Sequence, residues 1–349
     1  MCIRDRIISK GGELLHDFGQ VTTEDGIYKN SITIPSLDWY AENILSVTGE
    51  YYGVEKTIEK EFEVFVKKSA GGGCSTTNPF DISDRIGTDA VPNSIAFNND
   101  GTKMFIVDKN NKNVHEYRLC NSYSMGGASY TTSFSISGKV PSPQSIAFNS
   151  DGTKMFILDQ DSNNLDITEF ALSTGFDISS ASYTTEGCDF DDNDYKKPTA
   201  IDFNSDGTIL RVLNKTGSID NVLEYTLGTG FSIGTCSSYD ADTSSDSFNS
   251  TEAKPEGMAF NDVGTKMFIV GNQNDSVYEY TLSTAYDVTD DAATLAYTLD
   301  ISDQEGVPRG LEFNSDGTKM FIVGNGNNNV EINAYILGTA WDISTATLI

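Results

Sequence analysis

The sequence predicts an all-β protein whose main part is a β-propeller of four-stranded blades. Three observations favour this fold class. One motif recurs five times, with a similar spacing between its copies. Apolar residues within each copy alternate with a period of two, and no stretch shows the 3.6-residue period of an amphipathic helix. Self-similarity with a period of this size is typical of solenoids, propellers and arrays.

The repeated motif begins at a proline and reaches a glycine nine residues later in every copy. The first copy is 92–107, and the others begin at Pro143, Pro198, Pro255 and Pro308. Successive copies are offset by 51, 55, 57 and 53 residues. Because the motif has no internal gap, we expect its length variation to fall in the loops.

The first half of each repeat predicts two strands joined by a tight turn. In the first copy, Ile95 and Phe97 alternate with small or polar residues, which is the period of a strand. Gly101 ends an Asn-Asp-Gly turn, because glycine adopts a positive φ without steric cost. The apolar run 104–107 then predicts a second strand that neighbouring sheets bury on both faces.

The second half of each repeat predicts two more strands. A polar turn at 108–113 precedes a third strand that ends in an aromatic-x-Leu signature, found at 117–119, 170–172, 225–227, 280–282 and 335–337. A polar loop leads to a fourth strand, such as 130–136 or 296–301. Four antiparallel strands in a repeat of this size form the blade of a β-propeller. We therefore expect five equivalent phenylalanines to be buried: Phe97, Phe148, Phe203, Phe260 and Phe313.

The repeat also resembles a known family. The run Phe-Asn-Ser-Asp-Gly-Thr-Lys-Met-Phe-Ile-Val at 313–323 resembles the YVTN and related propeller repeats of surface and secreted proteins. The segments Leu-Ser-Thr-Ala-Tyr-Asp-Val at 282–288 and Leu-Gly-Thr-Ala-Trp-Asp-Ile at 337–343 strengthen the resemblance, which covers 78–349. It implies a propeller fold and an extracellular or cell-surface location, but no single activity, because such propellers host many activities.

The ends of the repeat region predict how the ring closes. The segment Phe80-Asp81-Ile82-Ser83 matches the fourth-strand segments at 134–137 and 299–302. The last repeat stops where its own fourth strand begins, at 346–349. The expectation is that 80–83 supplies or completes the missing strand and closes a five-bladed ring without open edges. The alternative is a fragment of a ring with six to eight blades.

The region before the repeats divides into three parts. The opening at residues 1–10 resembles the spurious starts of metagenomic gene predictions and is expected to be non-native. Short alternating strands over 11–68 predict a partial β-sandwich. The segments at 38–40 and 48–53 resemble the closing strands of Ig-like modules in archaeal and bacterial surface proteins. Residues 69–77 form a linker rich in Gly, Ser and Thr, and the propeller occupies 78–349.

Composition excludes several classes of function. With 23 basic and 51 acidic residues, the net charge of −28 argues against nucleic acid or an anionic membrane surface as a partner. No apolar run approaches the roughly 18 residues of a membrane span. Two histidines and five cysteines without CxxC spacing disfavour zinc sites and Ser-His-Asp chemistry. Scattered free thiols are the favoured state of the cysteines, ahead of one or two disulfides.

Five positions stand out as candidates for a ligand face. The residue after each repeat proline varies while its neighbours repeat, and these residues are Asn93, Gln144, Thr199, Glu256 and Arg309. Variable polar tips on a repeated scaffold are typical of a binding surface. The alternative is that exposed loop positions drift freely.

A second candidate is a calcium loop. Asp159, Asp161 and Asn163 place oxygens at alternating positions, as loops for hard cations do. The glycine and terminal glutamate of the full calcium signature are absent, and Asx turns that need no metal are the alternative.

The sequence therefore favours a secreted or cell-surface propeller that recognises a carbohydrate, a surface protein or a matrix component without covalent chemistry. One alternative is a calcium-dependent propeller hydrolase or lactonase, for which Glu256, Asn93 and Asp159 would be the site. Another is a structural spacer in a cell-surface array.

Overall fold

The computed structural model divides the chain into two compact units, Met1–Gly73 and Cys74–Ile349. In the first unit it describes the backbone of four strands. In the second it describes residues 80–160, 167–188, 197–215, 220–236, 241–242, 252, 254–288, 293–326 and 330–349.

The described strands of the first unit form one antiparallel sheet. They are β1 (Cys2–Ser9), β2 (Leu14–Thr22), β3 (Asn43–Tyr51) and β4 (Val54–Glu61), in the order β2-β1-β3-β4. Strand β1 pairs with both β2 and β3, so residues 2–9 belong to this sheet.

The second unit contains five sheets, and in each one the first four strands follow one another in sequence order and pair antiparallel. Blade 1 is β6 (Pro92–Phe97), β7 (Lys103–Asp108), β8 (Asn113–Arg118) and β9 (Ser129–Ser135). Blade 2 is β10 (Pro143–Phe148), β11 (Lys154–Asp159), β12 (Ile167–Leu172) and β13 (Ala181–Cys188). Blade 3 is β14 (Pro198–Phe203), β15 (Ile209–Lys215), β16 (Asp220–Thr226) and β17 (Ala241–Asp242). Blade 4 is β18 (Pro255–Phe260), β19 (Lys266–Gly271), β20 (Ser276–Leu282) and β21 (Ala293–Asp300). Blade 5 begins with β22 (Pro308–Phe313), β23 (Lys319–Gly324) and β24 (Glu331–Leu337).

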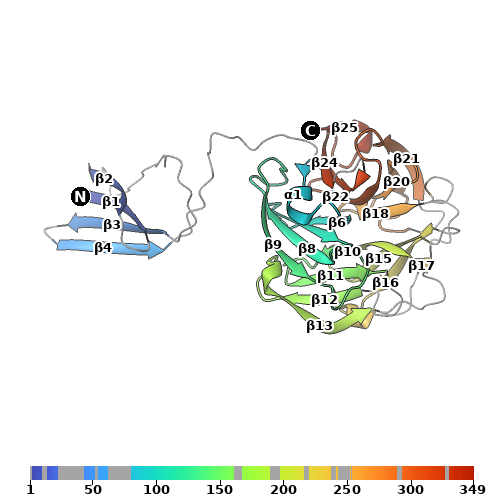
Figure 1. Cartoon of the computed structure of the whole chain (residues 1–349), viewed down its shortest axis with the longest axis horizontal. Helices are drawn as coiled ribbons and strands as arrows, with labels where there is room; N and C mark the ends of the chain where they lie inside the picture. Colours follow the sequence, from blue (N-terminus) through green and yellow to red (C-terminus); the bar gives the residue numbers. More distant parts are fainter. Residues whose placement is uncertain are drawn as a thin grey trace. The chain divides into compact units, whose positions relative to one another are not determined.

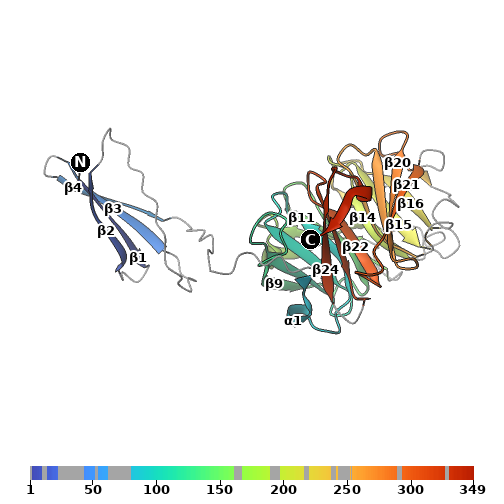
Figure 2. The same ribbon diagram turned by 90° about the horizontal axis from the view of Figure 1, so that it is seen from above.

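The five blades close into a ring. The inner strands contact one another in the cycle β6, β10, β14, β18, β22 and back to β6. Figures 1 and 2 show the blades arranged around a common axis. The outer strand of blade 5 has two pieces, because β5 (Phe80–Asp81) and β25 (Ala346–Leu348) pair with different parts of β24. The predicted five-bladed propeller is therefore confirmed, with 80–81 completing a strand that the C-terminal residues begin.

Helical structure is minimal in the described residues. A single turn, α1 (Ser83–Ile86), follows β5, and short 3₁₀ turns such as η1 (Ile178–Ser180) precede some outer strands. No described helix has the length and apolar composition needed to cross a membrane.

Aromatic clusters fill the space between neighbouring blades. At the junction of blades 1 and 2, Phe105 packs against Phe148, with ring centroids 4.7 Å apart, and against Phe176. Phe105 and its equivalents Phe156, Phe268 and Phe321 are fully buried. The predicted burial of the inner-strand phenylalanines is only partly correct, since Phe313 is buried while Phe97, Phe148, Phe203 and Phe260 are half-buried. The most buried phenylalanine is the one on the second strand, because both faces of that strand are covered.

The cysteine prediction was wrong for at least three residues. Cys188, at the end of β13, forms a disulfide with Cys236, which follows the 3₁₀ turn Ile233–Thr235 of blade 3. Cys120 is also disulfide-bonded. The sequence could not show this, because the first pair is separated by 48 residues and only the ring brings the two cysteines together.

Candidate functional site

The five predicted ligand-face residues all lie at the same structural position. Each is the second residue of an inner strand, and the pairing register slips at that residue in every blade. In blade 1, Pro92 pairs with Asp108 and Ser94 with Val107, which leaves Asn93 as the extra residue. A bulge of this kind redirects a side chain and is frequent beside functional sites. The structure thus brings the five predicted residues together around one end of the central channel, called here the channel mouth.

These residues form part of the wall of the mouth and are not loose loop tips. Asn93, Gln144, Thr199 and Glu256 are only 3–8 % exposed. The amide nitrogen Nδ2 of Asn93 donates to Gln144 Oε1 at 2.9 Å, across the boundary between blades 1 and 2. The alternative that these positions vary freely because they are exposed does not apply to four residues that are this buried.

A second ring of polar side chains lies beside the first. It consists of the residues at or directly after the end of the second strand of each blade: Lys109, Gln160, Lys215, Asn272 and Asn325. The backbone N–H of each donates to the carbonyl of the residue before the repeat proline, as in Lys109 N to Val91 O at 2.9 Å. This bond holds the second ring against the start of the inner strands. Lys109 and Lys215 were not singled out from the sequence, although their place at the end of a repeated strand would have identified them.

Glu256 is the carboxylate among the five ligand-face residues, and nitrogen donors surround it. Its Oε1 accepts a bond of 2.5 Å from Lys215 Nζ and one of 2.8 Å from Asn272 Nδ2. Arg309 Nη1 lies 4.0 Å from its Oε2. Glu256 has a side-chain exposure of 8 %, whereas Lys215 and Arg309 have exposures of 19 % and 25 %. The two cations are therefore more exposed than the carboxylate they face.

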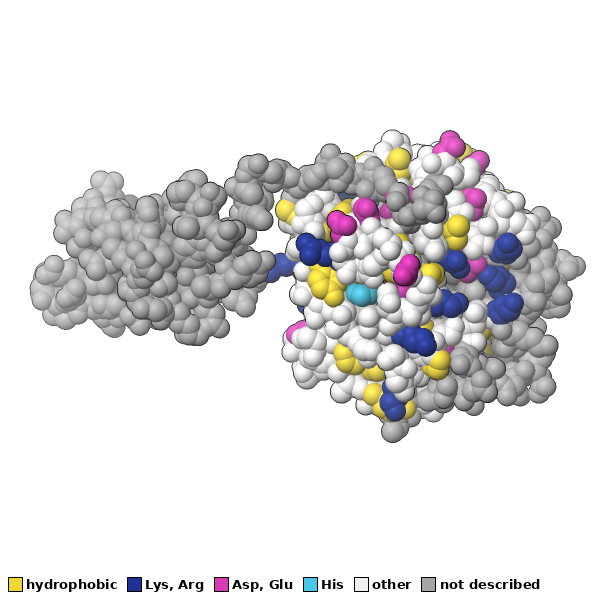
Figure 3. Space-filling model, in the orientation of Figure 1, with side chains coloured by type: hydrophobic (Ala, Val, Ile, Leu, Met, Phe, Trp, Pro, Cys, Tyr) yellow, Lys and Arg dark blue, Asp and Glu magenta, His cyan; other side chains and the backbone are white. Residues whose placement is uncertain are grey.

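The cations of the mouth are more exposed than its carboxylates, since Asp108, Asp159, Glu252 and Glu256 are all buried. Burial and the nearby charge of Arg309 lower the pKa of Lys109, with Lys215 acting in the same direction. Lys197 and Lys254, which precede the repeat prolines of blades 3 and 4, add two exposed cations. Figure 3 shows Lys and Arg side chains gathered near the middle of the propeller in that view.

Carboxylates near the mouth accept hydrogen bonds from the backbone of its loops. Asp108 Oδ1 accepts from Val91 N at 3.0 Å, and Asp159 Oδ1 accepts from Ser142 N at 2.8 Å. In blade 4 the second strand ends in Gly271, and Glu252 occupies the space that a side chain there would need. Glu252 Oε1 accepts from Lys254 N at 2.8 Å.

The predicted calcium loop is only partly described. Asp159 is fully buried, and Asp161 and Asn163 lie outside the described residues. Within the described part of the chain, no group of three or more His, Cys, Asp and Glu side chains is placed to hold a metal ion. The calcium site stays a prediction.

Below the mouth the channel is narrow and contains carboxyl groups. A cavity of about 20 Å³, near the room that one water molecule needs, is lined by the inner strands. Glu312 lines it, and Asp202 occupies the equivalent position in β14. Burial raises the pKa of Asp202 to about 6, and burial with the nearby charge of Asp202 raises the pKa of Glu312 to about 8.

No protein-family model and no curated protein matches the chain. Among solved structures, a protein from Lactobacillus plantarum has 10% identity and a TM-score of 0.43, over 100% of this chain and 95% of its own. A functionally unknown protein from Desulfotomaculum acetoxidans has 9% identity and a TM-score of 0.41, over 88% and 75%. The periplasmic gluconolactonase PpgL of Pseudomonas aeruginosa has 11% identity and a TM-score of 0.39, over 74% and 70%. At these identities and TM-scores, the similarity gives this chain neither a family nor an activity.

Proposed function

We propose that this protein is an extracellular or cell-surface recognition protein that binds an acidic carbohydrate at the channel mouth. The observation that carries the proposal is a difference in exposure: the cations Lys109, Lys215 and Arg309 are partly exposed, whereas Glu256 and the other carboxylates described at the mouth are buried. Carboxylate and sulfate groups accept strong charge-assisted hydrogen bonds from such cations. The proposal also takes the chain to be a YVTN-like propeller that follows an Ig-like module.

The neutral polar groups of the mouth support a carbohydrate over a plain anion. Asn272 donates to Glu256, and Asn325 Oδ1 accepts from Arg309 Nε at 3.4 Å, so both amides lie beside the charged groups. Amide groups both donate to and accept from sugar hydroxyls. Asn93 Oδ1 is buried and has no hydrogen-bond partner among the described residues. A sugar hydroxyl or a bound water that donates to Asn93 Oδ1 would satisfy it.

The proposed location rests on the disulfides. Three of the described cysteines are disulfide-bonded, and structural disulfides persist in oxidising compartments and are rare in reducing ones. This supports a protein that works outside the cytoplasm.

The two alternatives make different demands on the same residues. A calcium-dependent lactonase needs Glu256, Asn93 and Asp159 to share a cation, whereas Glu256 is paired with Lys215 and Asn272. A structural spacer needs no ligand at all. Both remain as outcomes of the experiment below.

The test is a calorimetric titration of the full chain with uronic-acid oligosaccharides, sulfated oligosaccharides and neutral oligosaccharides of the same length. We expect saturable binding of an acidic series and at least tenfold weaker binding of the neutral series. The Lys215→Ala/Arg309→Ala variant should lose the acidic ligand, and Lys139→Ala, which removes an exposed lysine over the ring of Tyr183, should keep it. Equal affinity for neutral and acidic chains would contradict the proposal, and no binding to any chain would favour the spacer.

A further inference from the structure

A lysine connects neighbouring blades at four of the five junctions. The first residue of the second strand donates from Nζ to the carbonyl oxygen of an aromatic residue in the next blade, at 2.6–2.9 Å; the pairs are Lys103 with Phe176, Lys154 with Phe231, Lys266 with Trp341 and Lys319 with Tyr123. At three of these junctions the same ammonium also pairs with a buried glutamate of the third strand, as Lys103 does with Glu116 at 2.9 Å. Each junction of this kind is therefore a small, fully built site for an ammonium group.

The junction of blades 3 and 4 lacks this lysine. Ile209 stands at the lysine position, and Arg211 replaces the buried phenylalanine two residues later. Arg211 Nη2 pairs with Glu224 Oε2 at 2.8 Å and lies 3.4 Å from the carbonyl oxygen of Tyr286. Its guanidinium carbon lies 5.0 Å from the ring centroid of Phe260 and 4.8 Å from that of Tyr286. The guanidinium of Arg211 thus bonds to a third-strand glutamate and an aromatic residue's carbonyl oxygen, as the lysines do at the other junctions. It reaches them from the position that a phenylalanine occupies in the other blades.

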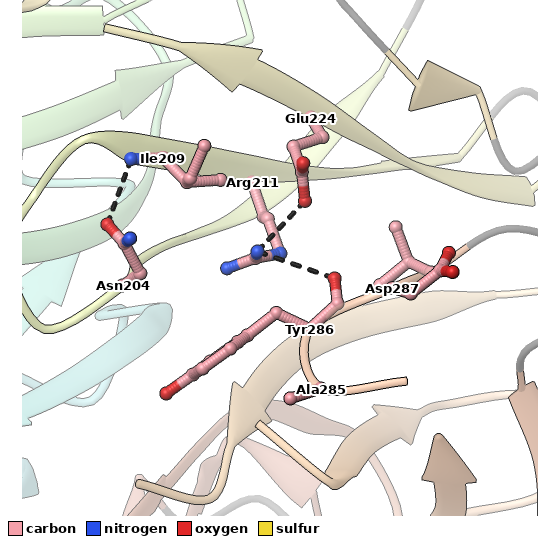
Figure 4. A pocket seen from close by; sticks show the side chains of 8 residues that line it. Asn204, Ile209, Arg211, Glu224, Ala285, Tyr286 and Asp287 are labelled. Carbon is pink, nitrogen blue, oxygen red and sulfur yellow. Dashed lines mark hydrogen bonds and ion pairs between the residues drawn. The ribbon is translucent and has the colours of Figure 1, made fainter. Parts of the chain in front are cut away.

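This exchange leaves a cavity. A pocket of about 320 Å³, over twice the roughly 150 Å³ of an engineered cavity that binds benzene, opens at this junction. Ile209 and Glu224 line it on one blade, and Tyr286, Asp287 and Val288 line it on the next, as Figure 4 shows for the labelled residues. The side-chain exposure of Glu224 is 20 %, whereas the glutamates that have a lysine partner have exposures of 3–5 %. The glutamate is accessible here because no lysine covers it.

We propose that this pocket binds a primary ammonium group on an alkyl stem, such as the side chain of a lysine in a peptide. The ammonium would share Glu224 and the carbonyl oxygen of Tyr286 with Arg211. These two acceptors are the equivalents of the groups that hold the lysines elsewhere in the ring. The apolar walls made by Ile209 and Val288 match the methylene stem of the ligand.

The charges that face the pocket favour a cation. Glu224 and Asp287 are acidic, and Arg211 is the basic residue among the lining side chains. The charge of Arg211 is balanced by its ion pair with Glu224 at 2.8 Å, so the three charged side chains that line the pocket leave one negative charge for an incoming cation. Asn204 lines one edge, where its Oδ1 already accepts from Ile209 N at 2.9 Å. The pocket lies at the opposite end of β15 from Lys215, so it is separate from the channel mouth.

The test compares two probes that differ only in the ammonium. The full chain is titrated with Nα-acetyl-lysine methylamide and with Nα-acetyl-norleucine methylamide, and the methyl signals of Ile209 and Val288 are followed by NMR. We expect saturable shifts of both methyl groups with the lysine probe and at least tenfold weaker binding of the norleucine probe. Equal binding of the two probes, shifts elsewhere in the protein only, or no binding would overturn the proposal.

The variant Ile209→Lys is the decisive control. It restores the residue found at the other four junctions, so its own ammonium should fill the site. We expect this variant to melt at or above the temperature of the wild type and to lose the lysine probe. Binding that persists at full strength in the folded variant would also overturn the proposal. If the variant does not fold, the methyl shifts and the two-probe comparison on the wild type still give the answer.

Discussion

Lys215 and Glu256 join blades 3 and 4 at the channel mouth, where Lys215 Nζ lies 2.5 Å from Glu256 Oε1. Lys215 is the last residue of β15, and Glu256 is the bulged residue of β18. The pair therefore connects the two rings of polar side chains that form the mouth. The two partners differ in exposure, since the Lys215 side chain is 19 % exposed and that of Glu256 is 8 % exposed. This asymmetry gives the mouth its cationic outer surface.

Ile209 and Arg211 replace the lysine and phenylalanine of the other blades, and this replacement predicts that substitutions at the two positions compensate for one another. Arg211→Ala should lower the free energy of unfolding by about 3–5 kcal/mol, because it leaves Glu224 without its partner and creates a cavity between two rings. The double variant Ile209→Lys/Arg211→Phe restores the arrangement of the other junctions and should stay within about 1 kcal/mol of the wild type. Urea denaturation measures both values. A double variant as unstable as Arg211→Ala would show that the two positions do not exchange roles.

The disulfide predicts a large stability contribution. Replacing Cys188 and Cys236 by alanine should cost about 4 kcal/mol, since the bond closes a loop of 48 residues in the unfolded chain. Thermal unfolding of the two proteins measures the difference. Peptide mapping of the non-reduced wild type provides the check, and full alkylation of both cysteines would contradict the assigned bond.

A glycine in the turn of blade 2 predicts a strong steric effect. Gly152 has a φ of +70°, and a Cβ atom there would lie 2.2 Å from the ring of Phe176. Gly152→Ala should therefore cost at least about 2 kcal/mol, from backbone strain and displacement of the ring. Gly138→Ala is the matched control, because a Cβ at Gly138 meets nothing within 4 Å. Similar melting temperatures for the two variants would contradict the close contact between glycine and ring.

The channel carboxyl group of Glu312 predicts a dependence of stability on pH. Burial raises its pKa from 4.5 to about 8, so the folded state holds the proton more tightly than the unfolded state. This contribution to stability is complete below about pH 4.5 and is lost as the pH rises to about 8. Glu312→Gln cannot lose a proton, so it should become more stable than the wild type by about 2 kcal/mol or more at pH 8.

Chemical denaturation of both proteins at pH 5 and pH 8 measures this effect. Asp202, with a pKa of about 6, is present in both proteins, and its charge adds to the raised pKa of Glu312, so the comparison reports Glu312 together with its repulsion from Asp202. A stability difference that does not change between the two pH values would contradict the assignment.

The sequence predicted the blades because the motif is local, and it predicted the ring because 80–83 matches a fourth strand. It also located Asn93, Gln144, Thr199, Glu256 and Arg309, since variation within a repeat is visible without coordinates. It could not show that most of these residues are buried, because the bulge that turns them into the channel depends on the pairing register. The sequence shows that Arg211 differs from the phenylalanine of the other repeats. It could not show the partners Phe260 and Tyr286, because they belong to the next blade.

The most direct test of the proposed recognition of acidic carbohydrate is the effect of Glu256→Gln on the dissociation constant of an acidic oligosaccharide at fixed ionic strength. The substitution removes the carboxylate charge that faces Lys215 and Arg309, while the amide oxygen of the new side chain can still accept a hydrogen bond from Lys215. A single unit charge near the ligand is worth about 1 kcal/mol, so the variant should bind about fivefold more tightly than the wild type. Weaker binding, or a loss of binding together with a loss of bound calcium, would contradict the cationic mouth and favour the metal-dependent alternative.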